Sequence, residues 1–345
     1  MSPYELLRTQ LAAHPRRWLI TGVAGFIGSH LLETLLALDQ EIVGLDDFST
    51  GSARHLQEVR ASVTETQWSR FTFCEGSVVH LDTCHAACTD VDYILHQAGF
   101  VSVPRSLEDP RTCHETNVTG TLNILLAARE AGVRRVVYAS SSAVYGDDAR
   151  LPKIEGQIGR PLSPYGASKL MAEIYARLFY EQCQVESVGL RYFNIFGPRQ
   201  SPTGGYAAVI PQWITKLLRG EECMIHGDGA ITRDFCPVSD AVQANLLAAT
   251  TEIPLDSARI YNVALGGATT LVHLYALLSE VVTTLGVKPP QPIRYGPARP
   301  GDILRSAADT TAIRTALGFE PSESPASGLD TTVRWFANDS SKETK

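Results

Sequence analysis

The sequence predicts an α/β protein with a doubly wound parallel sheet and a smaller C-terminal α/β lobe. Short apolar runs alternate with stretches of helical periodicity, which is typical of parallel strands joined by crossover helices. Directly after the first apolar run, three glycines stand at G-x-x-G-x-x-G spacing in residues 21–28. The 345 residues suffice for about two domains, or for one elaborated α/β unit with an appended lobe.

The composition is that of an ordinary globular protein. Hydrophobic residues make up 44% of the chain, charged residues make up 19%, and the net charge is -7, so nucleic acid is not the obvious partner. No apolar run is as long as a transmembrane helix, and residues 1–17 lack the features of a signal peptide. We therefore expect no membrane association and a cytoplasmic location. The seven cysteines include no C-x-x-C pair, which predicts neither a disulfide framework nor a metal site.

The glycine turn predicts a binding site for the pyrophosphate of a dinucleotide in a Rossmann-type domain. It lies between a predicted strand, residues 18–20, and a predicted helix, residues 29–38. Such a turn needs residues without a Cβ, and the helix N-terminus offers unpaired N–H groups and the positive end of its dipole. The candidate cofactor contacts in the turn are Gly22, Gly25, Phe26, Ile27 and Gly28.

The second predicted strand, residues 41–45, ends in two acidic residues. A ribose-binding carboxylate is expected roughly 20 residues after the glycine turn, and Asp46 stands at about that distance. Asp46 and Asp47, without an adjacent basic residue, would repel a 2′-phosphate, which favours NAD over NADP. Thr50 and Gly51 follow in a turn-rich loop and are candidate adenosine contacts, with a plain surface loop as the alternative. A glycine turn with an unrelated acid is disfavoured by the complete strand–turn–helix–strand–acid pattern.

Residues 71–74 and 93–96 are the third and fourth predicted strands. Loops that leave the carboxyl ends of parallel strands line the ligand crevice. The residues that become candidate cofactor contacts by position alone are Ser77, Gln97, Ala98 and Gly99. His96 is predicted to be a packed residue at the end of its strand rather than a ligand.

A serine cluster stands at the end of the fifth predicted strand. A helix is predicted for residues 117–131, where apolar residues recur at helical spacing before Gly132, a suitable C-cap. The strand of residues 135–139 follows and delivers the serines 140–142 to the same edge of the sheet as the cofactor.

A Tyr-x-x-x-Lys pair supplies candidate acid–base chemistry. Tyr165 opens a helix predicted to run to about Glu181, and Lys169 projects from the same face one turn later. A phenol with a pKa near 10 is a poor base at neutral pH. A neighbouring ammonium is expected to stabilise the phenolate and to lower this pKa.

With these motifs, the chain resembles the extended short-chain dehydrogenase/reductase family, and more narrowly its nucleotide-sugar 4-epimerases. The matching motifs, between about residues 16 and 336, are Thr21-Gly22-x-x-Gly25-Phe26-Ile27-Gly28, Asp46, Ser141 within Ser-Ser-Ser-Ala-Val-Tyr-Gly, Tyr165-x-x-x-Lys169 and Leu190-Arg191-Tyr192-Phe193-Asn194. The resemblance implies that Ser141 and Tyr165 flank the sugar C4 hydroxyl while Lys169 holds the nicotinamide ribose. It adds Tyr192 to the NAD contacts. Ser142 supports Ser141 or touches the sugar, with a turn hydroxyl bonded to backbone as the alternative.

The resemblance also implies a set of contacts with a UDP-sugar. They are Ser102, Arg105, Ser141, Asn194, Val209, Arg233, Arg299, Asp302 and Ser306. Arg233 and Arg299 would meet the diphosphate, which fits the need for local cations in a chain of negative net charge. The alternative for each arginine is a surface ion pair.

Two positions favour epimerisation over sister reactions. The 4,6-dehydratases carry Asp-Glu directly after the hydroxyl residue of this motif, and the nucleotide-sugar decarboxylases keep a glutamate at the second position. This chain has Ser142-Ala143. Elimination of the C6 hydroxyl therefore lacks its proton carriers, whereas epimerisation needs no second acid–base pair.

The substrate expected from the resemblance is a UDP-N-acetylhexosamine. Ser306 stands at a position that is small in relatives accepting N-acetylated sugars. The pattern is most similar to epimerases that interconvert UDP-N-acetylglucosamine and UDP-N-acetylgalactosamine, or the uronic acid forms, for surface polysaccharides. Val101 and Ala143 depart from the N-acetyl-preferring relatives, and Ser77 replaces a usual aspartate. UDP-glucose and UDP-glucuronate therefore stay open as alternatives.

The implied mechanism passes through a transient 4-keto sugar. The Tyr165 phenolate removes the C4 hydroxyl proton, directly or through Ser141, while the hydride moves to NAD; the sugar then turns over and the hydride returns to its other face. The protein must therefore bind the UDP moiety tightly and the hexose weakly, so that the hexose can turn over. The alternatives are a net oxidoreductase that exchanges NAD at each turnover and a non-catalytic NAD-binding regulatory protein, which would not need Ser141, Tyr165 and Lys169 together.

The chain is predicted to divide into two lobes. Residues 1–194 form the NAD-binding domain, which begins with a lead-in helix or arm, and residues 231–270 return to it. Residues 195–230 and 271–336 form the UDP-sugar lobe, and residues 337–345 are a polar tail expected to be disordered. The resemblance implies a homodimer through a four-helix bundle that includes the Tyr165 helix.

Overall fold

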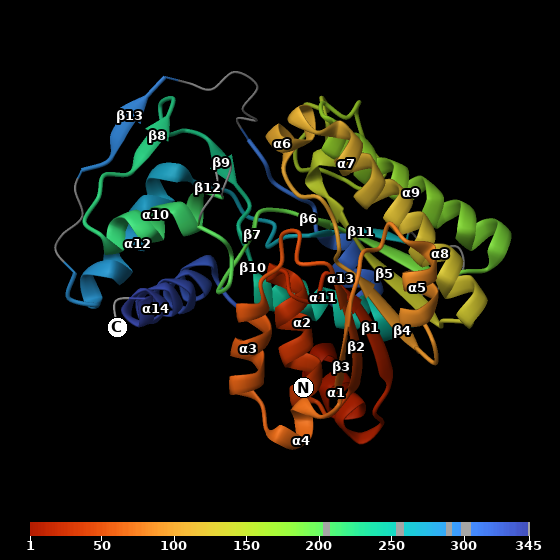
Figure 1. Ribbon diagram of the computed structural model, residues 1–345. Helices are drawn as coiled ribbons and strands as arrows, with labels where there is room; N and C mark the ends of the chain where they lie inside the picture. Colours follow the sequence, from red (N-terminus) through yellow and green to blue (C-terminus); the bar gives the residue numbers. More distant parts are fainter. Residues whose placement is uncertain (203–207, 253–258, 288–291, 298–304, 344–345) are drawn as a thin grey trace.

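The computed structural model describes residues 1–202, 208–252, 259–287, 292–297 and 305–343, and its centre is a parallel sheet (Figure 1). The seven strands lie in the order β11-β6-β5-β4-β1-β2-β3, and every neighbouring pair is parallel. Their bounds are β1 Arg17–Thr21, β2 Glu41–Asp46, β3 Phe71–Glu75, β4 Tyr93–His96, β5 Arg135–Ser141, β6 Ser187–Tyr192 and β11 Ile260–Val263. The order reverses between β1 and β4, so the predicted doubly wound parallel sheet is confirmed.

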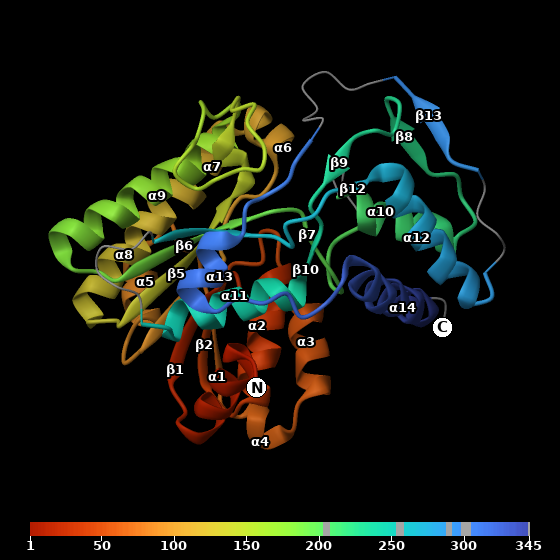
Figure 2. The same cartoon turned by 180° about the vertical axis from the view of Figure 1, so that it is seen from behind.

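Helices cover both faces of this sheet, as Figure 2 shows from behind. One face carries α1 Pro3–Ala13, α2 Phe26–Ala37, α3 Ala53–Ser62, α4 Glu65–Trp68, α11 Val238–Thr250 and α13 Thr311–Leu317. The other face carries α5 Leu81–Ala87, α8 Gly120–Ala131 and α9 Pro164–Cys183. Trp18 and Ile20 of β1 pack into the first of these cores, and Leu19 between them packs into the second. This alternation is what a strand buried on both faces requires.

The predicted strands and helices are confirmed with small shifts at their ends. The five expected strands lie within β1 to β5, and the lead-in segment is helical. The first crossover helix, α2, begins at Phe26 rather than at Ser29. The helix expected from residue 117 begins as a π-helical turn, Glu115–Thr119, and ends at Gly132, whose φ of 66° makes it the predicted C-cap. Between β4 and this turn lie α6 Val103–Glu108 and α7 Pro110–His114.

A second group of elements lies beside the sheet, on the left in Figure 1. Its members are β7 Ile195–Phe196, α10 Val209–Leu218, β8 Met224–His226, β9 Thr232–Arg233, β10 Cys236–Pro237, β12 Thr269–Thr270, α12 Leu271–Thr284, β13 Arg294–Gly296 and α14 Pro325–Glu343. Three two-stranded pairings, β7 with β10, β8 with β13 and β9 with β12, connect the strands. Apolar side chains of α10, α12 and α14 share a core separate from those of the sheet, and this group is called the second lobe below.

Three parts of the chain differ from the sequence-based expectation. Within the range 231–270, β9, β10 and β12 belong to the second lobe rather than to the sheet domain. Within the range 271–336, Ile313, Leu317 and Phe319 pack in the core of the sheet with α1 and α2, not in the second lobe. The expected disorder of the tail is wrong for residues 337–343, which continue helix α14. The physical reason is that the same helix buries Val333 and Phe336 in the second-lobe core, so the following turns extend an anchored helix. Within the described ranges, no helix is both long enough and apolar enough to cross a bilayer.

Candidate active site

The glycine turn has the close backbone contacts that the sequence predicts. Gly22 has a φ of 69°, and a Cβ added to it would lie 2.7 Å from the backbone nitrogen of Ala98. A Cβ on Gly28 would lie 2.0 Å from the carbonyl oxygen of Gly22. The turn therefore tolerates only glycine at these two positions, and it packs against the loop that follows β4.

The first turn of α2 leaves its N–H groups without a side-chain cap. Gly25 is the N-cap residue and has no side chain to accept a hydrogen bond. Phe26 and Ile27 are the first helical residues. Unpaired N–H groups and the helix dipole make such a terminus a site for a phosphate anion.

Asp46 lies at the end of β2, held by the backbone on either side. Its Oδ2 accepts a hydrogen bond from the Ala24 N–H at 2.8 Å, and its Oδ1 accepts one from the Phe48 N–H at 2.8 Å. Burial raises the pKa of this carboxyl, and the two N–H groups act in the opposite direction. The carboxylate thus stands beside the glycine turn, where a ribose hydroxyl would meet it, so this turn and this acid together fit a bound NAD.

Ser77, which replaces a usual aspartate, contacts the loop after β2. Asp47 accepts hydrogen bonds from Ser49 and from Ser77. Burial acts to raise the pKa of Asp47, but these hydrogen bonds outweigh it and the pKa falls. Ser77 therefore supports the loop that carries Asp47. Gly51 is close by, since a Cβ added to it would lie 2.8 Å from Asp46 Oδ1.

A ring of three polar side chains lies between β4, β6 and α11. The Tyr192 hydroxyl donates to Gln97 Oε1 at 3.1 Å, Gln97 Nε2 donates to Asn245 Oδ1 at 2.9 Å, and Asn245 Nδ2 donates to the Tyr192 oxygen at 2.7 Å. Two predicted cofactor contacts, Gln97 and Tyr192, are thus brought together. Asn245 was missed, because it lies inside an apolar helix with no motif around it.

His96 has the structural role that the sequence predicts for it. Its Nδ1 is 2.7 Å from Thr21 Oγ1, and its Nε2 is 3.1 Å from Thr121 Oγ1. Burial lowers the pKa of His96 to about 3, with a smaller effect of the Lys169 charge in the same direction. A neutral imidazole bonded at both nitrogens is a packing residue of the sheet.

The proposed acid–base group lies at the carboxyl end of β5. Ser141 ends this strand, and Tyr165 is the second residue of α9. The Tyr165 phenol and the Ser141 side chain are hydrogen-bonded. Ser163 caps α9 by accepting from the Gly166 N–H at 3.1 Å, and the Tyr165 N–H donates to Ser106 Oγ at 3.1 Å. The start of the helix, and with it the phenol, is therefore fixed from two sides.

Lys169 lies one helical turn from Tyr165 but bonds elsewhere. Its Nζ donates to the carbonyl oxygen of Ala139 at 2.8 Å. Burial lowers the pKa of Lys169 to about 8. A Cβ added to Gly99 would lie 3.2 Å from Nζ, so the predicted contact Gly99 and this amine are neighbours.

The pKa of Tyr165 is raised, whereas the sequence-based expectation was that it would be lowered. Burial raises it, and the hydrogen bond with Ser141 offsets this only in part. The expected lowering by Lys169 is absent, because the amine is directed to the Ala139 carbonyl and loses hydration itself.

A buried ion pair lies directly beneath the serine cluster. Arg191 of β6 and Glu173 of α9 are each 3% exposed and form two hydrogen bonds, at 2.9 and 2.8 Å. Ser140 Oγ donates to the same carboxylate at 2.5 Å. This pair joins β5, β6 and α9 below Ser141. The sequence signal for it was Arg191 in the family motif, but Glu173 carried none.

Asn117 is a further site residue that sequence reasoning missed. It lies in the π-helical turn, and its Oδ1 accepts from the Phe100 N–H at 2.7 Å while its Nδ2 donates to Ser168 Oγ at 2.9 Å. It thereby ties the loop after β4 to α9 between Tyr165 and Lys169. A single asparagine at the start of an apolar helix gave no signal for this contact.

The predicted sugar-side residues that follow β4 lie at the surface. Ser102 has a φ of 151°, and its hydroxyl caps α6 by accepting from the Arg105 N–H at 3.3 Å. The guanidinium of Arg105 lies 4.8 Å from the ring centre of Phe100. Val101 is 66% exposed. Ser102 and Arg105 are thus each held by a contact within the segment that follows β4.

The remaining predicted residues lie on three other segments. Asn194 Nδ2 donates to the Asp234 carbonyl at 3.2 Å, and Val209 begins α10. Arg233 donates to the Thr232 carbonyl at 2.9 Å, and the Ser306 N–H donates to the same carbonyl at 3.2 Å, so these two candidates are neighbours. Ser142 begins a 3-10 turn, Ser142–Tyr145, and is half-buried. Thr50 lies in the loop before α3, and Arg299 and Asp302 fall outside the described residues.

Known proteins share the sequence pattern and the fold of this chain. The model of the NAD dependent epimerase/dehydratase family matches residues 18–264. A UDP-glucose 4-epimerase of Mycolicibacterium smegmatis is 36% identical over 94% of this chain and 99% of its own. A UDP-N-acetylglucosamine 4-epimerase from Methanobrevibacter ruminantium, in complex with UDP-N-acetylmuramic acid, superposes with a TM-score of 0.85 at 33% identity, covering 94% of this chain and 99% of its own. A Thermus thermophilus UDP-glucose 4-epimerase in complex with NAD superposes with a TM-score of 0.78 at 32% identity, covering 93% and 98%.

Proposed function

The chain belongs to the NAD dependent epimerase/dehydratase family and uses NAD, and we propose that it inverts C4 of a UDP-N-acetylhexosamine. The reaction would interconvert UDP-N-acetylglucosamine and UDP-N-acetylgalactosamine, or their uronic acid forms. Such products would be consumed by glycosyl transfer, the reaction class that builds polysaccharides.

The observation that carries the proposal is the hydrogen bond between Tyr165 and Ser141, at the same edge of the parallel sheet as the glycine turn. Ser141 would orient the C4 hydroxyl, and the Tyr165 oxygen would take its proton and return it to the C4 oxygen after the sugar has turned its other face toward the cofactor. Lys169 would hold a ribose hydroxyl through its amine. When bound, NAD supplies the hydride acceptor and a positive charge, which favours the phenolate against the effect of burial on the Tyr165 pKa.

The residues around Ser141 support epimerisation rather than loss of water, because they offer the sugar no available carboxyl group. Positions 142 and 143 carry no carboxyl group. Glu173 lies below, but it is buried and committed to Arg191 and Ser140. A proton carrier for elimination has to reach the sugar, and this carboxylate does not meet that requirement.

We assign the sugar nucleotide to the space between the sheet and the second lobe. Residues 1–194 and 231–270, apart from β9, β10 and β12 of the second lobe, would bind NAD. Residues 195–230 and 271–336, apart from the segment around α13, would hold UDP together with β9, β10 and β12. Arg233 is the described cation for the diphosphate, and Arg299 and Asp302 enter this assignment from the sequence alone. A firm hold on UDP is what allows the hexose to turn without leaving.

The N-acetylated substrate is supported by the small Ser306 near Arg233. A specific observation favours the alternative, UDP-glucose or UDP-glucuronate. Val101, 66% exposed, adds bulk in the loop after β4, at a position where N-acetyl-preferring relatives are expected to have glycine. An acetamido group and a branched side chain compete for such space.

A homodimer is proposed from the outer face of α9. Met171, Ile174 and Leu178 recur at helical spacing on this face, and all three are exposed. Figure 1 shows α9 at the outer side of the molecule, next to α8. An apolar stripe of this length on a monomer would be covered by a second copy in the helix bundle implied by the resemblance.

One assay tests the catalytic proposal. Purified protein is incubated separately with UDP-N-acetylglucosamine, UDP-glucose and UDP-glucuronate, without added cofactor, and the product sugars are identified. We expect the galacto epimer of the N-acetylated substrate. Turnover of UDP-glucose alone would overturn the substrate choice, and a strict need for stoichiometric added NAD would overturn epimerisation.

A further inference from the structure

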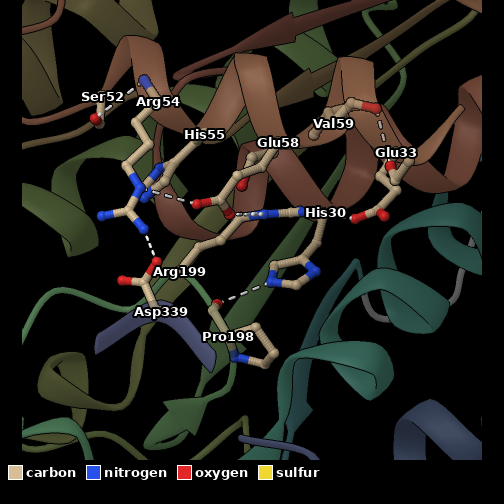
Figure 3. Close-up of polar contacts among 12 residues, drawn as sticks. His30, Glu33, Ser52, Arg54, His55, Glu58, Val59, Pro198, Arg199 and Asp339 are labelled. Carbon is tan, nitrogen blue, oxygen red and sulfur yellow. Dashed lines mark hydrogen bonds and ion pairs between the residues drawn. The ribbon is translucent and has the colours of Figure 1, made fainter. Parts of the chain in front are cut away.

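A chain of charged side chains runs from the NAD-binding helices to the end of the second lobe. Its members, in spatial order, are Glu33 of α2, Arg199, Glu58 and Arg54 of α3, and Asp339 of α14. Figure 3 shows these side chains pointing toward one another from α2, α3, α14 and the loop that follows β7. None of them belongs to the candidate active site described above.

Arg199 stands at the centre of this chain. It lies in the second-lobe loop that directly follows β7, it is 7% exposed, and its φ is 64°. Its Nη2 lies 2.7 Å from Glu33 Oε2, and its Nε lies 3.3 Å from Glu58 Oε2. A side chain from this second-lobe loop is thus fixed to α2 and α3, the helices that follow the first two strands of the sheet.

A second contact crosses directly between the lobes. Arg54 donates to Glu58 Oε1 at 3.1 Å and forms an ion pair with Asp339. Asp339 stands near the end of α14, whose Leu329, Val333 and Phe336 pack in the second-lobe core. Because Glu58 receives both Arg199 and Arg54, the loop contact and the helix contact form one network.

The network also reaches the glycine turn. The carbonyl of Pro198 accepts a hydrogen bond from His30 Nε2 at 2.9 Å, and the His30 ring packs edge-on against Phe26 at 5.8 Å. His55 of α3 bonds through Nδ1 to the Ala24 carbonyl at 2.8 Å. The residue before Arg199 is therefore two contacts away from the first helical residue of the pyrophosphate turn.

This arrangement is costly for stability alone. A buried guanidinium loses its hydration, and Arg199 Nη1 has no hydrogen-bond partner among the described residues. Apolar side chains of similar volume would join the same elements without that cost. Charged groups with defined geometry instead fix the distance and orientation of the loop against α2 and α3.

We propose that these five residues form an interlobe latch, in which Arg199 positions the second lobe over the NAD domain and so retains the 4-keto sugar until it is reduced. The inference rests on the proposed epimerisation. Arg199 is a positioning residue that acts through the lobe, without contact to the substrate.

If the latch is weakened, the sugar is oxidised at C4 but is released before it is reduced again. One UDP-sugar loses its C4 hydride to NAD and its hydroxyl proton to the protein. If the lobe opens at that point, a UDP-4-keto sugar leaves, and one NADH stays for each sugar oxidised. An intact latch gives epimer with almost no retained NADH.

The test compares four full-length proteins: the unaltered chain, Arg199→Lys, Asp339→Asn and, as a matched control, Asp330→Asn. Lysine at 199 keeps the charge between the two glutamates but loses the fork. Asp330 also stands on α14 and forms an ion pair, but with Arg334 of the same helix. Asp339→Asn removes only the outer contact, which keeps the proposal testable if Arg199→Lys folds poorly.

The readout is the ratio of retained NADH, from its absorbance, to epimer formed from UDP-N-acetylglucosamine or UDP-glucose. We expect this ratio to rise about tenfold in Arg199→Lys and about threefold in Asp339→Asn, as weak to moderate ion-pair couplings predict. Asp330→Asn should match the unaltered chain. An equal ratio in all four active proteins would overturn the latch.

A second readout does not depend on turnover. Deuterium uptake is measured for peptides that cover residues 195–202 and α14. Arg199→Lys should accelerate exchange in both segments, and Asp330→Asn in neither. Unchanged exchange would overturn the latch even if the protein epimerises. Absence of epimer from the unaltered chain, with altered exchange in Arg199→Lys, would overturn the proposed function and with it the retention of a 4-keto sugar, but would support the interlobe contact itself.

Discussion

The NAD side and the sugar side of the proposed site differ in how their polar groups are held. On the NAD side, Asp46, His96 and Tyr192 are each bonded on two sides by other elements of the sheet domain. On the sugar side, the Ser102 hydroxyl caps its own short helix, and Val101 is exposed next to it.

This difference matches the two tasks of an epimerase. A cofactor that is reduced and oxidised in every turnover gains from groups fixed in advance, because no reorganisation is then needed during the reaction. A sugar that has to present both faces would be hindered by equally strong contacts. The comparison therefore predicts large effects of changes on the NAD side and small, substrate-dependent effects on the sugar side.

The largest effect is expected for Tyr165→Phe. Removal of the phenol oxygen removes the proposed proton carrier, so C4 inversion should fall about a thousandfold while the NAD content stays normal. Product formation and bound nucleotide are measured on the same sample. Tyr175→Phe, on the same helix, serves as the control and should keep full activity. An active Tyr165→Phe protein would break the proposed mechanism.

Gly28→Ala should come next, through loss of the NAD-binding turn. The added Cβ meets the Gly22 carbonyl at 2.0 Å, and two backbone segments cannot separate cheaply. We expect a loss of about 3 kcal/mol in the free energy of unfolding and little copurified NAD. Gly156→Ala, where nothing lies within 4 Å of the added atom, is the control. Normal melting and NAD content of Gly28→Ala would contradict the rigid NAD side.

The pH dependence tests the charge of Lys169. With a pKa of about 8, lowered by burial, the amine is charged below pH 8 and neutral above it. If ribose binding needs the charge, kcat/KM should fall as pH rises through 8, by about tenfold per unit at the limit. Lys169→Arg keeps a charge at all these pH values and should lose this alkaline limb. Persistence of the limb in that variant would assign it to another group.

The smallest effect is expected for Val101→Gly on the sugar side. Removal of this branched side chain should raise kcat/KM for UDP-N-acetylglucosamine relative to UDP-glucose by about fivefold. This is less than the roughly 10- to 200-fold that a methylene is worth in an enclosed pocket, because Val101 is largely exposed. The absolute rate and the melting temperature should change little. Val103→Ala, a neighbouring exposed residue, should leave the ratio unchanged. A large loss of activity in Val101→Gly would show that the sugar side is as strictly held as the NAD side.

Local motifs identified the fold and part of the candidate site. The expected strands end within two residues of the apolar runs, and the turn, Asp46 and the Tyr165–Lys169 helix lie in the predicted elements. The expected lowering of the Tyr165 pKa was wrong, because spacing along a helix says which groups share a face but not where an amine finds its acceptor. The disordered tail was wrong for a similar reason: a polar composition does not reveal that its first turns continue an anchored helix.

The sequence by itself determined the alternation of strands and helices, the glycine turn, the choice of NAD and the residues available for proton transfer. These depend on backbone sterics, periodicity and side-chain chemistry, which act within a few residues. Only the tertiary structure decided that Asn245 completes the ring with Gln97 and Tyr192, that Glu173 is committed to Arg191, and that Arg199 joins the two lobes. Each of these contacts joins residues far apart in the chain, and their partners are selected by packing rather than by any local pattern.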